Sequence, residues 1–394
     1  MIASTSVDEP GRRDRTARAA KLRAKRRGRC FLVAPSGQPG GGMGRVSDYL
    51  MQAARADARM PNYVAVDSRG SGHVLWSPFY LLLAMARIAL GVIRRDVALV
   101  HFNVGERGSL WRKGVLILWA RVLRLPIVLH LHAAQLLQHH ARLPEPFRIL
   151  VRTIFRSADC CIVLGDFWRR FLIEELGVNA GKVVILYNGV PRAVLSRQSR
   201  PCDRQLRILF LGNLMERKGV TDLLEALARE PLSGMNWRAT LAGGGPIESY
   251  RRKAESLGLL PRVEFAGWVD QRGAAELLAA SDVLVLPSYD EGLPLVILEA
   301  LTAGVPVVCS PVGAIPEILE HGKNAVFVQP GDSQGLADAL AELGSEPALR
   351  ERLALEGRAL YDREFSLEIF AARVVGIYRT YCSFDVPTRV VMDQ

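Results

Sequence analysis

Short apolar runs alternate with longer helical patterns along almost the whole chain of 394 residues. The runs are continuously apolar, as expected of strands whose two faces are both covered by helices. Strands that alternate with helices predict βαβ units and parallel sheets. The expected strands are residues 30–34, 63–66, 99–102, 127–131, 160–164 and 183–187 in the first half, and residues 207–211, 238–242, 263–266, 283–286, 305–309 and 325–328 in the second.

A polar segment at residues 191–205 separates the two sets of strands and is typical of an interdomain linker. One hydrophobic core rarely grows beyond about 250–300 residues, so the chain length also favours two domains. The sequence therefore predicts two Rossmann-like, doubly wound α/β domains, at residues 30–195 and 196–365, that face each other across a cleft. A further amphipathic helix is expected at residues 366–384, and its pattern does not say where it packs.

The N-terminal tail, residues 1–29, carries ten basic and three acidic residues and very few apolar ones. Such a composition cannot form a core, so we expect a disordered basic tail. Two interpretations stay open: a solvated extension, or an electrostatic tether to anionic lipid. Nothing outside the tail favours nucleic-acid binding, so we expect no nucleic-acid partner.

The most membrane-like segment is residues 76–93, which contains Pro78 and Arg87. A membrane span needs about 20 apolar residues, so this segment is marginal. It predicts a buried or half-buried helix, with a surface resting on a bilayer and a true span as alternatives. The six cysteines show no C-x-x-C spacing, which fits a reduced, cytoplasmic setting.

Glycines follow the first expected strand. Ligands of open α/β sheets bind at the carboxyl ends of the strands, so residues that directly follow strands are candidates for the site. Gly42 and Gly44 belong to a glycine-rich loop that runs into a helix. Glycine lets the backbone approach a ligand, and a helix N-terminus attracts phosphate. The loop predicts a phosphate cradle, with a tight turn as the alternative.

A pair of cations follows the first strand of the second half. The segment begins at Gly212 and Asn213 and continues to Arg217 and Lys218. Two adjacent cations at the carboxyl end of a strand suit a diphosphate, because they neutralise charge that builds on a leaving group. A solvated surface pair is the alternative.

The strongest signal is the run S-Y-D-E-G-L-P at residues 288–294. Pro294 suits the first position of a helix, which would aim the backbone N–H groups around Gly292 and Leu293 at an anion. Glu291 precedes this helix and Glu299 lies within it. One carboxylate is suited to the hydroxyls of a sugar and the other to a ribose diol. The alternative for Glu299 is an ordinary acidic residue on the surface of a helix.

Softer candidates lie in the first half. His132 follows a strand and points the same way as His130, and a structural role is the alternative for both. Asn103 also follows a strand, and the nearby Arg112 and Lys113 predict a basic rim for a phosphate-bearing acceptor, with a solvated face as the alternative. The chain has no D-x-D motif, so we expect no metal and no cofactor.

Taken together, these motifs resemble the GT4 family of retaining glycosyltransferases, also called glycosyltransferase group 1. The resemblance covers residues 30–383. It rests on the frame S-x-x-E-G-x-P-x-x-x-x-E-A-x-x-x-G-x-P-V-V from residue 288 and on the motifs Gly212…Lys218-Gly219, Ala242-Gly243-Gly244-Gly245-Pro246, Asn188-Gly189-Val190 and Gly313-Ala314-Ile315-Pro316-Glu317.

The resemblance implies a GT-B fold, a nucleotide-sugar donor linked to UDP or GDP, and retention of anomeric configuration. It also implies roles for the candidates. Glu291 and the backbone of residues 292–294 would meet the donor sugar and phosphates, and Glu299 would meet the ribose. Lys218 would neutralise the leaving diphosphate. Gly42 and Gly44 would line the cleft, His132 would touch the sugar, and the last helix would cross back to the first domain.

The chain departs from the family at Asn213, where Arg is common, which leaves Arg217 as the nearest second cation. At residues 324–325, Asn-Ala replaces the usual Asn-Gly, a change that concerns only a turn.

The expected function is transfer of a sugar from a nucleotide-diphosphate donor to an acceptor hydroxyl. The expected acceptor is a glycan or a polyprenyl-diphosphate-linked saccharide in exopolysaccharide, capsule or lipopolysaccharide synthesis. This would place the enzyme in the cytoplasm, peripherally on the inner face of the plasma membrane. The alternatives are a nucleotide-sugar epimerase on the same fold and a degenerate transferase that acts as a membrane scaffold.

Overall fold

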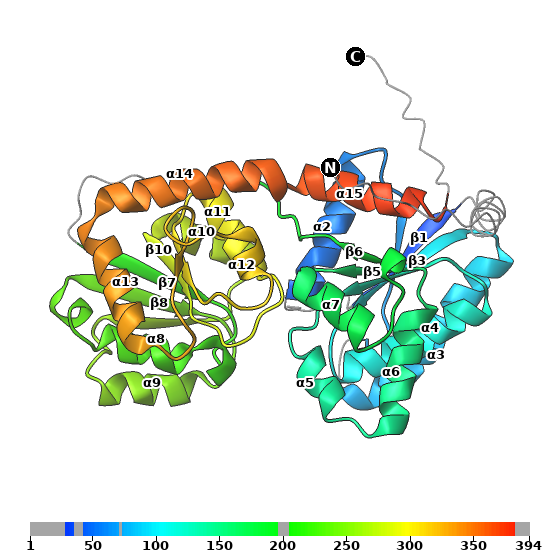
Figure 1. The fold of residues 1–394 in the computed structure, drawn as a ribbon, viewed down its shortest axis with the longest axis horizontal. Coiled ribbons are helices and arrows are strands. Elements are labelled where there is room, and N and C mark those ends of the chain that lie inside the picture. The colour runs from blue at the N-terminus through cyan, green and yellow to red at the C-terminus, as the bar shows by residue number, and fades with distance from the viewer. Residues whose placement is uncertain (1–27, 35–41, 71–72, 196–204, 383–394) are drawn as a thin grey trace, which may run out of the picture.

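The structure is a computed structural model that describes residues 28–34, 42–70, 73–195 and 205–382. All twelve predicted strands are present, and they form two separate parallel sheets of six strands each. Figure 1 shows the two sheets side by side along the long axis of the molecule, each with helices packed on it. The sequence-based prediction of two doubly wound α/β halves is confirmed.

The N-terminal sheet has the strand order β2-β1-β3-β4-β5-β6. Its strands are β1 (Arg29–Val33), β2 (Tyr63–Val66), β3 (Val97–Val104), β4 (Ile127–Leu131), β5 (Cys160–Val163) and β6 (Val183–Ile185). Its helices are α2 (Gly42–Ala56), α3 (Ser77–Ile93), α4 (Gly108–Val122), α5 (Leu136–Ala141), α6 (Glu145–Ser157) and α7 (Asp166–Glu174), with single turns at Val74–Trp76 and Ala180–Lys182.

The two faces of this sheet meet different helices. Strand side chains such as Phe31 and Val100 pack in one core with α3, α4 and α6. Side chains of the opposite face, such as Leu32 and Val128, pack with α2 and with the C-terminal helix of the chain. Because side chains alternate between the faces of a strand, continuously apolar strands satisfy both cores at once.

The C-terminal sheet has the strand order β12-β11-β10-β7-β8-β9. Its strands are β7 (Leu206–Leu211), β8 (Trp237–Ala242), β9 (Val263–Gly267), β10 (Val283–Leu286), β11 (Val307–Cys309) and β12 (Val326–Phe327). Its helices are α8 (Val220–Leu227), α9 (Ile247–Ser256), α10 (Gln271–Ala280), α11 (Leu295–Ala303), α12 (Ile315–Ile318), α13 (Ser333–Ser345) and α14 (Pro347–Glu364), with single turns at Glu216–Lys218 and Leu232–Gly234.

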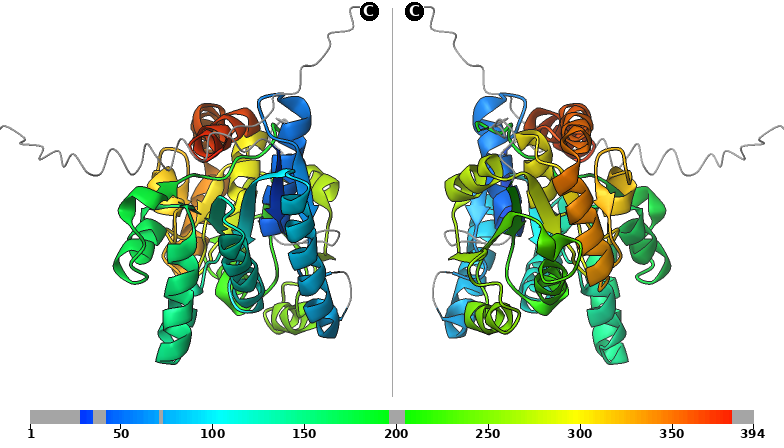
Figure 2. Two further views of the ribbon diagram at one scale, coloured as in Figure 1. Left: turned by 90° about the vertical axis from the view of Figure 1, so that its right-hand side faces the viewer. Right: turned by 90° about the vertical axis from the view of Figure 1, so that its left-hand side faces the viewer.

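The last helix, α15 (Leu367–Arg379), lies on the first domain. Ser366 caps it, since its hydroxyl accepts a hydrogen bond from the Ile369 N–H at 3.3 Å. Figures 1 and 2 show α14 and α15 following one another across the top of both domains. Phe370, Val374 and Tyr378 of α15 are buried, so the chain end closes the core of the domain in which the chain began.

One detail differs from the sequence-based expectations. Arg29, assigned to the basic tail, belongs to β1, because its guanidinium pairs with Asp96 at 2.9 Å. The rest of the expected tail, residues 1–27, and most of the expected linker, residues 196–204, lie outside the described residues. Residues 77–93 form α3, in which Ser77, Ala84, Ile88 and Gly91 are buried while the opposite side is exposed, so the expected buried or half-buried helix is a half-buried one.

Candidate active site

A cavity of about 480 Å³ lies between the two domains. It is lined by residues that follow the carboxyl ends of strands in both sheets, including His132 after β4, Gly212 after β7 and Glu291 after β10. This is the edge at which open α/β sheets bind ligands. The predicted site residues that line it are Gly42, His132, Gly212, Asn213, Arg217, Lys218, Glu291, Gly292, Leu293 and Pro294.

An ion pair between Lys218 and Glu291 forms one wall of the cavity. The Lys218 ammonium donates to Glu291 Oε1, and the Ser288 hydroxyl donates to the same oxygen at 2.7 Å. The side chains of the ion pair are only 13% and 7% exposed, so water screens their charges weakly. The residue directly after Lys218 has to be glycine, because φ of Gly219 is 68° and a Cβ there would lie 2.0 Å from Pro287 O.

Arg217 supplies a second cation to the same wall. Its Nη1 donates to the Asp290 backbone oxygen at 3.2 Å, which fixes the guanidinium beside Lys218. Burial raises the pKa of Asp290 to about 6, while the charge of Arg217 opposes the rise and that of Glu291 adds to it. The two cations sit where the sequence predicted a diphosphate, and a diphosphate there would meet both.

The N-terminus of α11 points into the cavity from the same side. Pro294 is the N-cap residue of α11, one position earlier than the sequence predicted, and Leu295 is the first helical residue. Residues 292–296 line the cavity. The first N–H groups of a helix have no partner within it and carry a partial positive charge, so this wall also favours an anion.

Glu299 makes hydrogen bonds across the cleft to α2. Arg45 Nη1 lies 3.1 Å from Glu299 Oε2, and the Tyr49 hydroxyl donates to Glu299 Oε1 at 2.9 Å. Burial, followed by the charge of Glu299, raises the pKa of Tyr49. The alternative interpretation of Glu299 as an ordinary helix-surface acid is therefore wrong, because its side chain is only 12% exposed and bonds to the opposite domain.

His132 is held by a hydrogen-bond network that forms the floor of the cavity. Asn103 Oδ1 lies 3.2 Å from His132 Nε2 and 3.0 Å from His101 Nε2, and Asn103 Nδ2 donates to Ser47 Oγ at 2.7 Å. Because an amide oxygen only accepts, both rings carry their proton on Nε2. Burial lowers the pKa of His132 to about 3 and that of His101 to about 4, so both rings are neutral at physiological pH.

His130 has a different environment. It is fully buried, and among the described residues neither ring nitrogen has a hydrogen-bond partner. Burial is the first cause that lowers its pKa, and its ring stacks 4.0 Å from that of His132. This is the structural role that the sequence left open for His130.

The expected basic rim near Asn103 takes another form. Asn103 and Lys113 are buried, and the Lys113 ammonium donates to the Asn103 backbone oxygen and to Ser109 Oγ at 3.1 Å. Burial lowers the pKa of Lys113 to about 7. Only Arg112 keeps part of its side chain accessible, and burial lowers its pKa as well. The first two residues therefore lie beneath the cavity floor instead of on a rim.

The site also contains residues that the sequence motifs did not indicate. Arg45 and Tyr49 hold Glu299, and they stand at i and i+4 on α2, directly after the glycine loop. Trp268, in the loop after β9, and Gln271, at the start of α10, also line the cavity, and Trp268 is 57% exposed. Their position after a strand was the available signal. The predicted Gly44 lies on α2 but does not line the cavity.

A carboxylate from the C-terminal domain also caps a helix of the N-terminal domain. Glu317 accepts from the Asp166 N–H at 2.7 Å and from the Phe167 N–H at 3.3 Å, at the start of α7. Asn188 Nδ2 donates to Leu293 O at 3.4 Å nearby. These contacts join the two domains beside the cavity.

Among the residues that the structure describes, no group of three or more His, Cys, Asp or Glu side chains is arranged to hold a metal ion. The charged groups that line the cavity include Arg45, Arg217 and Lys218 on the positive side and Asp48, Glu106 and Glu291 on the negative side.

The fold matches that of known glycosyltransferase structures. The solved structure of Anabaena HepE in complex with UDP and glucose superposes with a TM-score of 0.70 at 20% identity, covering 89% of this chain and 99% of that one. Two Rossmann-like domains with a cleft between the carboxyl edges of their sheets therefore give this chain the GT-B fold.

Two family models match adjacent parts of the chain. Residues 40–194 match the model described as Glycosyltransferase Family 4, and residues 205–346 match Glycosyl transferases group 1. The chain belongs to this family of group 1, family 4 glycosyltransferases.

Among the relatives, the phosphatidyl-myo-inositol mannosyltransferase of Mycobacterium leprae is 29% identical over 84% of this chain and 87% of its own length. The amylovoran biosynthesis glycosyltransferase of Erwinia amylovora is 29% identical over 70% of this chain and 67% of its own.

Proposed function

We propose that this glycosyltransferase moves a sugar from a UDP- or GDP-linked donor to an acceptor hydroxyl, with retention of anomeric configuration and without a metal ion. The observation that carries the proposal is the wall of the cavity formed by Arg217, Lys218 and the N-terminus of α11. Two cations and a helix dipole converge there on one volume, which suits a diphosphate. UDP in the structure of Anabaena HepE supports this class of ligand.

In the proposed step, the bond between the anomeric carbon and the diphosphate oxygen breaks while the acceptor oxygen attacks the same face of the sugar. The acceptor proton passes to the departing diphosphate oxygen. Lys218 and Arg217 stabilise the negative charge that builds on the diphosphate, and Glu291 faces the donor sugar. Holding both substrates in the cleft supplies the rest of the acceleration by positioning.

The remaining walls of the cavity take the other parts of the donor. Trp268 offers an aromatic surface to the base, and His132 offers its unprotonated Nδ1 to a sugar hydroxyl. His132 is suited to this task because Asn103 fixes its tautomer. Glu299 does not itself line the cavity, but it is bonded to the lining residue Arg45 and offers a carboxylate to the ribose.

The proposed acceptor is a lipid-linked saccharide, with a polyprenyl diphosphate as the lipid, in the synthesis of an exopolysaccharide, capsule or lipopolysaccharide. Relatives named for amylovoran synthesis and for phosphatidyl-myo-inositol support a glycan and a lipid as acceptor classes. The enzyme would then work peripherally on the inner face of the plasma membrane.

The test is a screen of the purified protein for binding and slow hydrolysis of UDP- and GDP-sugars, with and without EDTA. We expect saturable binding of one nucleotide sugar that EDTA does not change and that Glu299→Ala abolishes. Lys218→Met should keep donor binding while lowering hydrolysis by a factor of about 10²–10³, because the cation acts mainly on the leaving group.

Three outcomes would contradict the proposal. Binding that needs a divalent metal would assign the phosphate charge to an ion instead of Arg217 and Lys218. Conversion of the donor into an epimeric nucleotide sugar would indicate an epimerase. Failure to bind any nucleotide sugar would favour a scaffold role.

A further inference from the structure

Helices α3 and α4 carry large apolar side chains on the outside of the N-terminal domain. Each of these side chains is at least 44% exposed. They are Trp76, Phe79, Leu82, Leu83, Leu90 and Ile93 on and just before α3, and Val115 and Val122 on α4, and we call them the apolar face.

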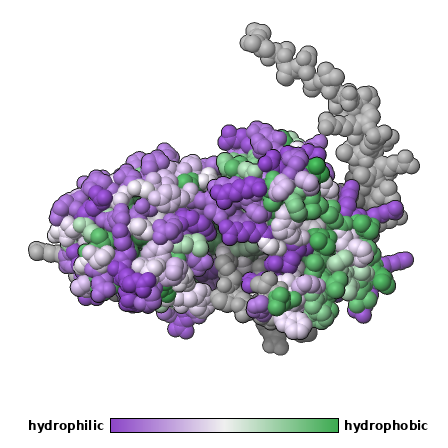
Figure 3. Space-filling view, turned by 90° about the horizontal axis from the view of Figure 1, so that it is seen from below, coloured by the Kyte–Doolittle hydropathy of each residue, from purple (hydrophilic) through white to green (hydrophobic). Residues whose placement is uncertain are grey.

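The apolar face of α3 is one continuous helical stripe. Residues 79, 82, 83, 86, 90 and 93 share one side of the helix, while Ala84, Ile88 and Gly91 are buried on the other. A helix that is apolar all round is normally covered on all sides, whereas α3 is covered on one. Figure 3 shows hydrophobic surface gathered over the N-terminal domain, while the C-terminal domain is mainly hydrophilic.

Helix α4 continues the face beside α3. The Trp119 indole nitrogen donates to the backbone oxygen of Met85 at 3.2 Å, which joins the two helices. Val115 and Val122 are four residues before and three after Trp119, so they share its side of α4. Contiguous exposed apolar surface of this kind indicates an interaction site.

The surface around the apolar face is strongly basic. Residues 73–157 contain twelve Arg and Lys, of which Lys113 is buried, but only three Asp and Glu. Arg87 is exposed at the edge of the stripe, one turn after Leu83. Arg95 and Arg124 follow the ends of α3 and α4, with φ of 57° and 55°, a conformation in which glycine is usual. Among the described residues, none of these three guanidinium groups has a hydrogen bond or an ion pair.

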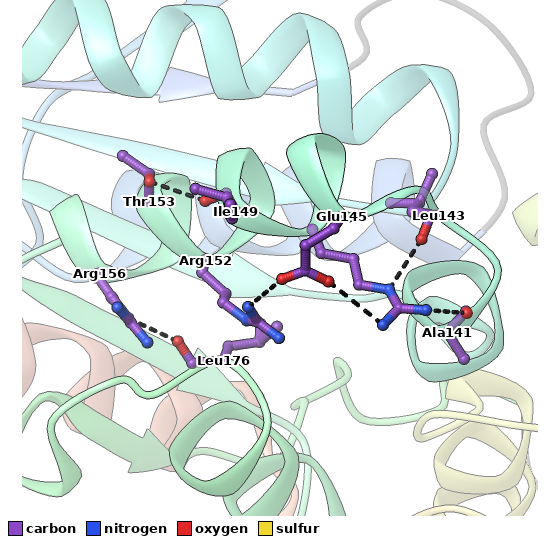
Figure 4. Close-up of polar contacts among 9 residues, drawn as sticks. Ala141, Leu143, Glu145, Ile149, Arg152, Thr153, Arg156 and Leu176 are labelled. Carbon is purple, nitrogen blue, oxygen red and sulfur yellow. Dashed lines mark hydrogen bonds and ion pairs between the residues drawn. The ribbon is translucent and has the colours of Figure 1, made fainter.

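The acidic residues of this region, in contrast, are already engaged. Glu145 accepts from Arg152 at 2.9 Å and from Arg148 at 3.5 Å, as Figure 4 shows on α6. Asp96 is held by Arg29. The third carboxylate of the region, Glu106, accepts from the Gln135 N–H at 2.8 Å and lines the cavity. The surface therefore offers cations and apolar side chains to a partner, while Glu145 and Asp96 are already paired with arginines.

We infer that the apolar face is the surface by which the enzyme docks on an anionic lipid bilayer. The inference rests on the proposed function, because a lipid-linked acceptor is what such docking would serve. A bilayer supplies hydrocarbon for Leu82 and Phe79 and anionic headgroups for Arg87, whose long side chain can reach the interface. A second copy of the chain would instead bring the same arginines together, since symmetric contacts pair like surfaces.

The position of the apolar face also suits the reaction. Helices α3 and α4 each begin at the carboxyl edge of the sheet, where the cavity lies, because each follows a strand of that sheet. Trp76, 62% exposed, therefore marks the end of the face nearest the cleft. Tryptophan prefers the membrane–water interface. Docking there would hold the cleft beside the bilayer surface, within reach of a lipid-linked hydroxyl.

The experiment is sedimentation of the full-length protein with vesicles of phosphatidylcholine, with and without phosphatidylglycerol, at low and high salt. We expect binding that requires phosphatidylglycerol and weakens with salt. Leu82→Asp should lower the partition coefficient roughly tenfold or more, because it puts a charge into the apolar stripe. Arg87→Glu should lower it as well, since the headgroup contact becomes repulsive.

Matched controls come from the C-terminal domain. Leu355→Asp on α14 changes a leucine of similar exposure, 69% against 63% for Leu82, and should leave vesicle binding unchanged. Arg252→Glu on α9 is the control for the charge reversal. Circular dichroism and thermal melting should show that all four variants are folded, because every changed side chain is exposed.

Wild-type vesicle binding by Leu82→Asp and Arg87→Glu would overturn the inference and assign any binding to another part of the chain. A dimer in solution that Leu82→Asp dissociates would overturn it too, because a second copy would then cover the apolar face.

The same variants are also tested for nucleotide-sugar binding, which distinguishes failure of the docking inference from failure of the proposed function. If it is normal while vesicle binding is lost, docking and donor recognition are both supported. If the wild-type protein binds vesicles but no donor, the proposed function fails and the docking surface stands.

Discussion

Asn103 is the side chain on which the floor of the cavity depends. It bonds with two histidines and a serine through one amide, and its backbone oxygen receives the Lys113 ammonium. An amide in this place fixes both histidines as Nε2–H tautomers without adding a charge to a buried site.

For Asn103→Asp, we expect the activity to become sensitive to acid at a higher pH than in the wild type. A buried carboxylate stabilises the imidazolium forms of His101 and His132 and raises their pKa values from about 4 and about 3. The measurement is the pH dependence of donor hydrolysis. Ser47→Ala is the control, because it removes only the hydroxyl that receives the Asn103 amide. Superimposable profiles for Asn103→Asp and the wild type would contradict this assignment.

Asp290 gives a second prediction for a single residue, based on the pH dependence of stability. Its native pKa of about 6 lies above the ordinary value of 3.8, so the folded protein binds a proton more tightly than the unfolded chain. Stability should therefore fall as the pH rises from about 4 to about 6, and the penalty should be complete above that range. Asp290→Asn should raise the melting temperature at pH 8, and this gain should shrink toward pH 5.

The control for this titration is Asp338→Asn, which changes an exposed carboxylate on α13. Its melting temperature should follow that of the wild type at every pH. If Asp290→Asn raised the melting temperature equally at pH 5 and pH 8, the added stability would not come from removing an ionisable carboxyl group.

Among the elements, α15 contributes most to joining the two ends of the chain. It packs where the segment 188–190 passes beneath it, and the Val190 N–H donates to Phe365 O at 3.0 Å. The glycine at position 189 permits this approach, because a Cβ there would lie 2.4 Å from Phe370 Cβ and 3.0 Å from Ser366 O. The motif Asn188-Gly189-Val190 thus has a packing explanation as well as a family one.

Two glycine-to-alanine changes separate the close packing of α15 on residues 188–190 from the intrinsic helix propensity of α15. Gly189→Ala should lower the free energy of unfolding by about 1–3 kcal/mol, because α15 has to shift away. Gly376→Ala should raise it by about 0.5–1 kcal/mol, because this exposed glycine lies inside α15 with no atom near its Cβ position. Urea titration of both variants is the measurement. A neutral Gly189→Ala would mean that α15 is not tightly seated on this segment.

Across the whole molecule, the contact of Glu299 with α2 ties the donor side of the cleft to the opposite domain. The carboxylate proposed for the ribose is already occupied by Arg45 and Tyr49, and Gln271 Nε2 lies 3.4 Å from the Tyr49 hydroxyl. A ribose diol that binds Glu299 has to displace at least one of these donors. Donor binding and the relation of the two domains are therefore linked.

Tyr49→Phe is expected to tighten nucleotide binding. It removes only the competing hydroxyl, so the Kd for the donor identified in the screen should fall by a factor of about 2–10. Isothermal titration calorimetry is the measurement, and Tyr63→Phe, which changes a buried hydroxyl away from the cavity, is the control. Weaker binding by Tyr49→Phe would instead place this hydroxyl on the donor.

The sequence by itself determined the strands and the half of the site that follows them directly. An apolar run and its length are local properties, so twelve strands could be predicted without knowing their order. Lys218 and Glu291 were found for the same reason, since any residue at the carboxyl end of a parallel strand reaches the ligand edge. Pro294 was placed within one residue because its fixed φ marks a helix start wherever it occurs.

The tertiary structure alone decided which candidates are covered and by what. Asn103 is buried because α2 and α4 pack over it, and Lys113 is buried because its side of α4 faces the Asn103 backbone. Tyr378 of α15 closes the same region from much further along the chain. The partners of Glu299 come from about 250 residues away, a distance over which local patterns carry no information. For the same reason, the sequence of α3 showed an apolar helix but not that one side of it stays open. Which apolar side chains of a helix become buried depends on how the whole fold packs around it.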